Sequence, residues 1–208
     1  MSEQALEVSG SSTALPSTAP VPSGGEAGSL IVDMSTALCS MVRICANSMK
    51  RYESKTDEIK ALLTRAVELH SRISEWADLS ADSFWPLSEA YKIPRDDPKR
   101  GPAIEQAILD AGSASMEMVK CCGEAIELLD EIQDKCSGLL ISDLACGAYL
   151  CRAAMESAAM NVFINTKYLK DRETARRLDA EVDAALSKYL PLADSIADAV
   201  LHSIRSEA

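Results

Sequence analysis

The sequence predicts an all-α protein, a single-domain bundle of six to eight helices around a long buried central helix. Apolar residues recur every three or four positions through most of the chain, which is the period of a helix buried on one side. Apolar-polar alternation over β-branched runs, which is typical of strands, is scarce. Hydrophobic residues make up 47% of the 208 residues and charged residues 25%, a balance that supports a packed core.

Residues 1–25 differ in composition from the rest of the chain. They consist mainly of Ser, Ala, Pro, Gly and Thr with a few acids, and contain no Lys or Arg and no apolar run. They therefore do not form a secretory signal, and they cannot bury enough surface to offset the entropy of ordering them. We expect a flexible Ser/Pro/Ala-rich tail over 1–25 and one helical domain over 26–208.

The first part of that domain is predicted to hold several amphipathic helices. The residue before a proline is disfavoured in helical angles, so a helix should end before Pro94. Pro102 suits the first turn of the next helix, where its missing N–H is not needed. With Gly112 as a further bend, the predicted helices are Leu30–Arg51, Glu53–Trp76, Asp78–Tyr91, Pro102–Ala111 and Ser113–Lys135.

The most apolar segment, Gly138–Ile164, is the predicted central helix. It contains Asp143, Arg152 and Glu156, whereas a membrane-spanning helix would be free of charge. It is also rich in Ala, Gly and Ser, whose small side chains allow close approach of neighbouring helices. We expect it to be surrounded on most sides, by other helices or by a second subunit. A last helix follows Lys170-Asp171, and Pro191 should kink or end it.

Charge and cysteine content limit the classes of partner. The net charge of −11 repels nucleic acid and anionic lipid, so we expect neither a nucleic-acid nor a membrane partner. With only two histidines and no regular cysteine spacing, a metal site is not expected. The seven cysteines are odd in number and indicate packing in a reduced, cytoplasmic compartment. We assign all of them to packing: Cys39, Cys45, Cys121, Cys122, Cys136, Cys146 and Cys151.

Polar residues inside the apolar helices are the first candidates for chemistry, because burying them without partners is costly. Asp143 and Asn161 are 18 residues apart and share one face of the central helix, but roughly 27 Å separates them along it. They can serve different ends of a long ligand or face different neighbours. The alternative is structural: buried Asn and Asp side chains often join helices, and Ser142-Asp143 suits a helix N-cap.

Several short motifs, in order, carry a family resemblance from Pro22 to about Ala185. They are Pro22-Ser23-Gly24-Gly25-Glu26, Ser40-Met41-Val42, Lys50-Arg51-Tyr52, Ser83-Phe84, Ala90-Tyr91-Lys92-Ile93-Pro94, Ser142-Asp143, Arg152-Ala153-Ala154-Met155-Glu156, Asn161-Val162-Phe163-Ile164-Asn165 and Leu169-Lys170-Asp171. In order and spacing the chain resembles the family of methenyltetrahydrofolate cyclohydrolases and the cyclodeaminase half of formiminotransferase-cyclodeaminase.

The resemblance implies a helical homodimer that binds a reduced folate and makes or breaks a C–N bond at an amidinium-like carbon. A carboxylate beside that carbon would stabilise the cation and move protons. The implied catalytic residues are Asp143, Glu26 and Asp82. The implied substrate-binding residues are Gly24, Gly25, Ser142, Tyr52, Phe84, Asn161, Asn165 and Phe163. No covalently bound cofactor is implied, and a tetrahydrofolate derivative enters as substrate.

Several polar positions of the family pattern differ here. Where the family has a loop serine this chain has Glu26, and where the family has Asn-Leu-Thr this chain has Ile44-Cys45-Ala46. An acidic residue of the family is replaced by Ser80, an asparagine by Leu139 and a basic residue by Phe163. Three readings stay open. The chain is a folate cyclohydrolase or cyclodeaminase, a cyclase or ring-opening enzyme for a non-folate imine or amide, or a catalytically dead binding protein.

Overall fold

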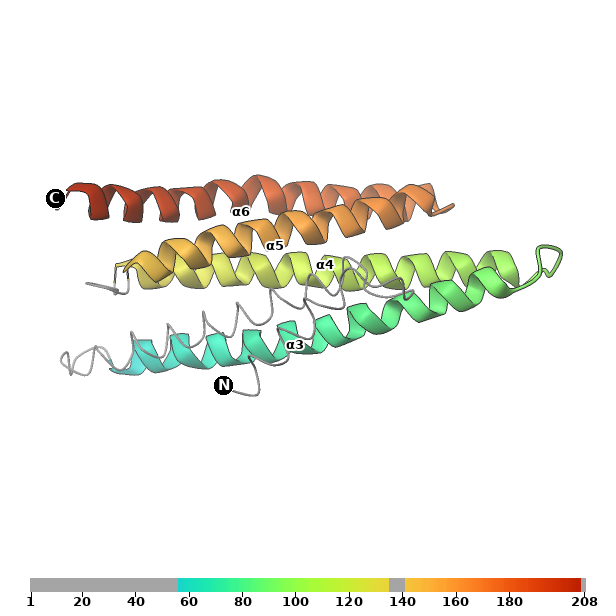
Figure 1. The fold of residues 1–208 in the computed structure, drawn as a ribbon, viewed down its shortest axis with the longest axis horizontal. Coiled ribbons are helices and arrows are strands. Elements are labelled where there is room, and N and C mark those ends of the chain that lie inside the picture. The colour runs from blue at the N-terminus through green and yellow to red at the C-terminus, as the bar shows by residue number, and fades with distance from the viewer. Residues whose placement is uncertain (1–55, 135–140, 207–208) are drawn as a thin grey trace, which may run out of the picture.

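The computed structural model describes residues 56–134 and 141–206, and within them it shows four long helices and no strand. The helices are α3 (Thr56–Lys92), α4 (Arg100–Gln133), α5 (Ile141–Tyr168) and α6 (Arg172–Ser206). They lie side by side in an elongated bundle (Figure 1). The predicted all-α class is therefore confirmed. The predicted helix Leu30–Arg51 and the predicted tail lie outside the described residues.

The helices are fewer and longer than the sequence pattern predicts. Over 56–206 that pattern predicts six helices, whereas the structure has four. The expected break near Ala77 is absent because α3 continues through it and through Pro86, and Gly112 lies inside an unbroken α4. Likewise α6 does not end at Pro191. Packing along neighbouring helices outweighs these local penalties, which for proline amount to about 3 kcal/mol each.

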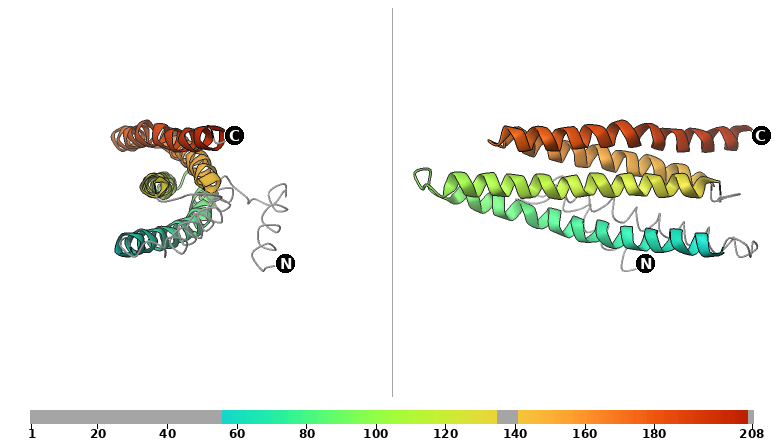
Figure 2. Two further views of the ribbon diagram at one scale, coloured as in Figure 1. Left: turned by 90° about the vertical axis from the view of Figure 1, so that its left-hand side faces the viewer. Right: turned by 180° about the vertical axis from the view of Figure 1, so that it is seen from behind.

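Helices α4 and α5 form the centre of the bundle. Helix α4 packs against α3, α5 and α6, and α5 packs against α4 and α6. Viewed end on, α3 and α6 lie at opposite sides of the bundle (Figure 2). The most deeply buried large side chains include Ile126 and Leu129 of α4, Leu144 and Met155 of α5, and Ile196 of α6. The segment expected as the central helix is α5, which buries one side against these two neighbours and leaves Tyr149, Met160, Ile164 and Tyr168 exposed, so it is not surrounded on most sides within the described residues.

Polar contacts determine how α5 turns into α6. Arg172 donates from Nη1 to the carbonyl oxygens of Thr166 and Leu169, at 2.9 and 3.2 Å, and so caps the end of α5. The Asp171 carboxylate accepts from the backbone N–H groups of Glu173 and Thr174, both at 3.1 Å, and so caps the start of α6. Because both ends are satisfied, the two helices can reverse direction within a few residues.

A buried hydrogen bond then holds α5 and α6 together just beyond the turn. Thr166, which is 1% exposed, donates its hydroxyl to Oδ1 of Asp179 at 2.6 Å. Further along, Arg152 of α5 donates from Nη1 to Glu156 at 2.9 Å, and its Nε lies 3.0 Å from Oδ1 of Asp194 in α6. Arg152 and Glu156 therefore form an i, i+4 ion pair, and the guanidinium also reaches the neighbouring helix.

None of the four described helices combines the length and the apolar character that crossing a membrane requires.

Candidate functional site

The predicted site residues fall into three groups by what the structure describes. Five of them lie on α5 with described side chains. For Asp82 and Phe84 the structure describes the backbone, within α3, and not the side chain. The remaining four lie outside the described residues: Gly24, Gly25, Glu26 and Tyr52.

Ser142 and Asp143 lie in the first turn of α5. Because α5 begins at Ile141, they are the second and third helical residues and not the N-cap pair that the structural alternative proposed. Ser142 is exposed and Asp143 is half-buried. A carboxylate in the first turn is stabilised by the positive end of the helix dipole. The same position leaves the Asp143 carboxylate partly accessible to a ligand.

Asn161, Phe163 and Asn165 lie near the other end of α5. The Asn165 side chain donates from Nδ2 to the backbone oxygen of Asn161 at 2.8 Å, and its Oδ1 is an acceptor. Gly112 of α4 lies against this point, since a methyl group added there would be 3.5 Å from Cβ of Asn165. Phe163 is half-buried and packs against the hydrophobic core. The Asn165 amide is therefore placed at the α4–α5 contact, and neither Asn161 nor Asn165 is fully buried.

The structure does not bring these two groups of α5 together within one chain. The helix is continuous from Ile141 to Tyr168, so Asp143 and Asn161 are about 27 Å apart along it. A single small substrate cannot touch both ends of the helix in one subunit. The separation along one helix that the sequence predicts is therefore present.

Two ion pairs between α3 and α4 define how these helices are aligned. They therefore show which α3 residues lie at the same height along the bundle as each of the two groups of polar residues on α5. Arg72 pairs with Glu124, at 2.6 and 3.0 Å, and Arg65 pairs with Glu131, at 2.6 and 2.9 Å. Both are two-pronged contacts, and they place the helices antiparallel in a regular register. Ten residues beyond Arg72, Asp82 is level with Ala114, two residues from the Gly112 that touches Asn165 on α5. The backbone around Asp82 therefore lies level with the Asn161–Asn165 group.

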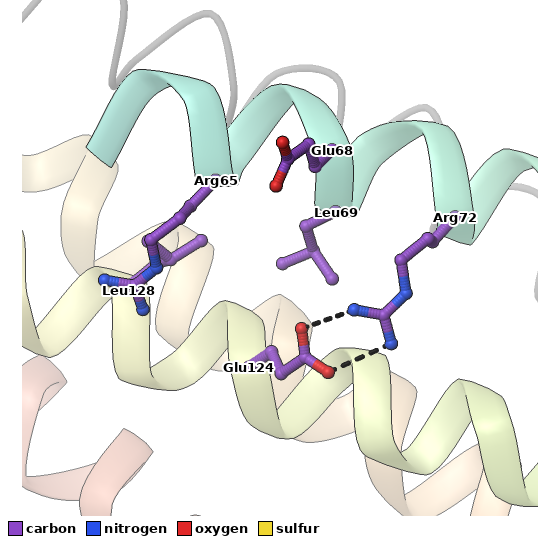
Figure 3. Close-up of a pocket in the computed structure, with 6 residues that line it drawn as sticks. All are labelled: Arg65, Glu68, Leu69, Arg72, Glu124 and Leu128. Atoms are coloured by element: carbon purple, nitrogen blue, oxygen red, sulfur yellow. Dashed lines mark hydrogen bonds and ion pairs between the residues drawn. The ribbon is translucent and has the colours of Figure 1, made fainter. Parts of the chain in front are cut away.

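A small groove lies between α3 and α4, at the height along the bundle of the end of α5 that carries Asp143. It has a volume of about 120 Å³ and is lined by Arg65, Glu68, Leu69, Arg72, Glu124 and Leu128. Figure 3 shows Leu69 between the two arginines, with the Arg72–Glu124 pair at one end. Pockets for drug-sized ligands measure about 300 to 1,000 Å³. The groove as these residues form it is too small for such a ligand.

The ion pairs also account for the electrostatics of the groove. The hydrogen bonds that Arg72 donates to Glu124 raise the pKa of Arg72, and those that Arg65 donates to Glu131 raise the pKa of Arg65. Both cations are therefore already neutralised by a carboxylate. The sequence analysis did not find this groove, because pairs that are 52 and 66 residues apart leave no local sequence pattern.

The four cysteines with described positions are all free thiols. Cys121, Cys122 and Cys151 are buried, and burial raises the pKa of Cys121 to about 11 and that of Cys151 to about 12. Their assignment to packing is confirmed, because thiols with such pKa values are not nucleophiles at neutral pH. Cys146 is exposed on α5, so its assignment to packing within the chain is wrong. No cluster of metal-ligating side chains occurs within 56–134 and 141–206.

Together the geometry defines a class: an elongated antiparallel bundle of long helices, with carboxylate and amide groups at separate levels. Residues 8–184 match the formiminotransferase-cyclodeaminase family, and the chain belongs to that family. The resemblance stated from the motifs is therefore confirmed.

Individual relatives match along nearly their whole length. A methenyltetrahydrofolate cyclohydrolase of Methylorubrum extorquens is 28% identical over 190 residues, which cover 89% of this chain and 91% of the relative. The solved structure of formiminotetrahydrofolate cyclodeaminase from Thermotoga maritima is similar in fold. Its TM-score is 0.75 at 20% identity, over 97% of this chain and 98% of that one.

Proposed function

We propose that this protein is an enzyme that opens or closes a C–N bond of a folate, with 5,10-methenyltetrahydrofolate as the substrate to test first. The observation that carries the proposal is the match, over about nine tenths of both chains, to a protein named methenyltetrahydrofolate cyclohydrolase. Membership of the formiminotransferase-cyclodeaminase family over residues 8–184 supports the same class of chemistry.

The proposed chemistry is addition of water to the amidinium-like carbon of the methenyl bridge. Water forms a new C–O bond and loses a proton to a carboxylate, and a ring C–N bond then breaks as its nitrogen takes up a proton. We assign the carboxylate role to Asp143, with Glu26 and Asp82 as further candidates. A positioned base of this kind contributes about 10² to 10⁴ in rate.

The other predicted residues would hold the substrate. A folate is long, with a pterin at one end and a glutamate at the other, and this suits polar groups at two levels of the bundle. We assign binding to Ser142, Asn161 and Asn165 on α5. The proposed binding residues outside this group are Gly24, Gly25, Tyr52, Phe84 and Phe163.

A second candidate is ring closure or opening on a non-folate imine or amide. The observation that favours it is Phe163, which occupies a position that is basic in the family pattern. Its side chain is half-buried against the core and offers no charge to an anionic substrate. An apolar side chain there suits a substrate with less charge than a folate.

The test is a spectrophotometric assay of 5,10-methenyltetrahydrofolate loss against a blank without enzyme. We expect loss well above the blank, and a drop of about 10²-fold or more in Asp143→Asn. Asp198→Asn, a carboxylate exposed on α6, is the matched control and should keep the wild-type rate. Absence of loss above the blank from folded wild-type protein would overturn the folate assignment and favour the second candidate or a binding protein.

The proposal extends to location and assembly. The net charge of −11 and the free thiols support a cytoplasmic enzyme with no nucleic-acid partner. We also propose a homodimer, which the resemblance of the motifs implies.

A further inference from the structure

One end of the bundle is positively charged, although the chain as a whole carries −11. The turn between α3 and α4 and the turn between α5 and α6 both lie at this end (Figure 1). We call residues 89–101 and 167–177, which comprise the two turns and the helix ends beside them, the turn end. It contains nine Lys and Arg against five Asp and Glu, a net charge of +4, so the rest of the chain carries −15.

Most cations of the turn end have no carboxylate partner. Lys92 pairs with Glu89 at 2.5 Å, and Arg177 pairs with Glu181 at 2.7 Å. The others have no carboxylate within ion-pair distance among residues 56–134 and 141–206: Arg95, Lys99, Arg100, Lys167, Lys170, Arg172 and Arg176. Elsewhere on the described helices six of the seven Lys and Arg side chains are ion-paired, and the exception is Arg205. The unpaired positive charge of the described residues is therefore concentrated at one end.

Three carboxylates at or beside the turn end bond to backbone N–H groups instead of pairing with its cations. Asp97 accepts from the N–H of Lys99 at 2.8 Å. Glu105 of α4 accepts from the N–H groups of Lys170 and Asp171, at 2.6 and 3.0 Å, and so joins the two turns. Asp171 itself caps the start of α6. Because these carboxylates satisfy N–H groups at turns and helix starts, the neighbouring ammonium and guanidinium groups are left available to a partner.

Two exposed tyrosines lie beside these cations. Arg100 donates from Nη1 to the backbone oxygens of Tyr91, at 3.0 Å, and Ile93, and its guanidinium carbon lies 5.9 Å from the centroid of the Tyr91 ring. Nζ of Lys167 lies 5.7 Å from the centroid of the Tyr168 ring. Tyr91 is 54% exposed and Tyr168 60%. Tyr and Arg are enriched among the residues that dominate binding at protein interfaces, so the turn end has the composition of such a surface.

We propose that the turn end binds an acidic segment of a partner protein in an extended conformation. Its unpaired cations lie where all four described helices end or begin, and neighbouring helices are about 8 to 10 Å apart, so the set spans about 20 to 30 Å. A single phosphate or carboxylate reaches only a few of these cations, whereas eight extended residues span about 26 Å. A polynucleotide is disfavoured, because beyond this end it meets a chain that carries −15. The proposal does not depend on the proposed function.

The first test is fluorescence anisotropy with a labelled peptide of about 12 residues, of which about eight are glutamates. The control peptide has glutamine in place of every glutamate and should not bind. The glutamate peptide should bind wild-type protein, and raising the salt from about 0.05 to 0.5 M should weaken its binding about tenfold or more, because salt screens exposed charges. Equal binding of the two peptides, or no binding of the glutamate peptide at low salt, would overturn the proposal.

Charge reversal locates the binding surface. Arg95→Glu combined with Lys99→Glu should weaken binding of the glutamate peptide about tenfold or more, since two attractive charges become repulsive. The matched control is Lys60→Glu combined with Arg205→Glu, near the start of α3 and in the last turn of α6, at the opposite end of the bundle (Figure 1). It changes the net charge by the same amount and should bind within about twofold of wild type. Circular dichroism should show unchanged helix content in both double variants. If both bind the peptide equally, the attraction is not located at the turn end and the proposal is overturned.

Cross-linking with a carbodiimide uses wild-type protein and so does not depend on the folding of a variant. The reagent activates a glutamate carboxyl group of the bound peptide, and a lysine amine then displaces the activating group as a urea and forms an amide. Peptide mass mapping should find these amides at the unpaired lysines of the turn end: Lys99, Lys167 and Lys170. The ion-paired lysines elsewhere on the described helices should remain free of them: Lys60, Lys120 and Lys188. Amides found mainly outside the turn end would overturn the proposal.

Competition distinguishes the proposed partner from other anions. Tripolyphosphate and tetrahydrofolate should displace the glutamate peptide only in large excess, because each reaches only part of the cation set. A single-stranded oligothymidine of about the same length should bind more weakly than the peptide. Displacement by tripolyphosphate at the concentration of the peptide would show a small-anion site, and displacement by tetrahydrofolate would assign the surface to the glutamate end of a substrate. Tighter binding of the oligothymidine would assign it to nucleic acid, and each of these three results would overturn the proposal.

Discussion

Replacing Gly123 by alanine should destabilise the protein, although alanine is the better helix former. Gly123 is buried in the middle of α4, where the Tyr189 ring of α6 lies across it. A Cβ added at this position would lie 2.5, 2.8 and 2.9 Å from three carbons of that ring. Contacts this short cannot persist, so either the ring or the helix must move.

Tyr189 is not free to swing away. Its hydroxyl donates to Oε1 of Glu127 at 3.0 Å and accepts from Nζ of Lys188 at 3.0 Å, and that ammonium also lies 4.5 Å from the ring centroid. Overpacking costs about 1 to 3 kcal/mol. Loss of the hydrogen bond to the Glu127 carboxylate costs about 1.5 to 3 kcal/mol. The gain in helix propensity is about 1 kcal/mol. With both costs set against this gain, the expected net loss is about 1.5 to 5 kcal/mol.

Urea denaturation followed by circular dichroism measures this loss, and Gly112→Ala is the control. A Cβ at Gly112 meets only Cβ of Asn165, at 3.5 Å, which is an ordinary contact. Gly112→Ala should therefore leave the free energy of unfolding unchanged or raise it by up to about 1 kcal/mol. If Gly123→Ala is as stable as Gly112→Ala, the packing of Tyr189 on α4 is not as described and the reasoning is refuted.

Three further predictions concern the described helices. Thr166→Val removes the buried hydrogen bond to Asp179 and should cost about 1.5 to 3 kcal/mol in urea denaturation, whereas an unchanged midpoint would contradict a structural role. Hydrogen bonds from Thr174 and Glu173 lower the pKa of Asp171 in the folded protein. The ionised carboxylate therefore stabilises the fold above the unfolded-state pKa, and this stabilisation is lost as pH falls through the lower folded-state pKa. The stability difference between wild type and Asp171→Asn should therefore shrink below pH about 4, and a difference constant over pH 2 to 7 would argue against it. Because burial raises their pKa values, Cys122 and Cys151 should resist alkylation at pH 8 until the protein is unfolded, as peptide mass mapping can show.

The candidate site could be predicted in part from the sequence. The separation of Asp143 and Asn161 follows from their spacing on one helix, and α5 has the continuity on which that depends. The exposure of Cys146 could not be predicted, because an apolar helix does not show which of its sides the other helices leave uncovered. The groove between α3 and α4 depends on the pairs Arg65–Glu131 and Arg72–Glu124, which arise only when the two helices are aligned.

By itself the sequence determined the helical class, the family and the approximate position of each helix, because periodicity and motif order are local properties of the chain. The tertiary structure decided where helices end and which face stays open. Pro86 and Gly112 are helix breakers by local propensity, yet α3 and α4 continue through them, since packing over a long helix outweighs a local cost of a few kcal/mol. The exposure of Tyr149, Met160 and Ile164 on α5 was decided in the same way, because burial depends on which sides of this helix α4 and α6 cover, and the sequence alone does not place those neighbours.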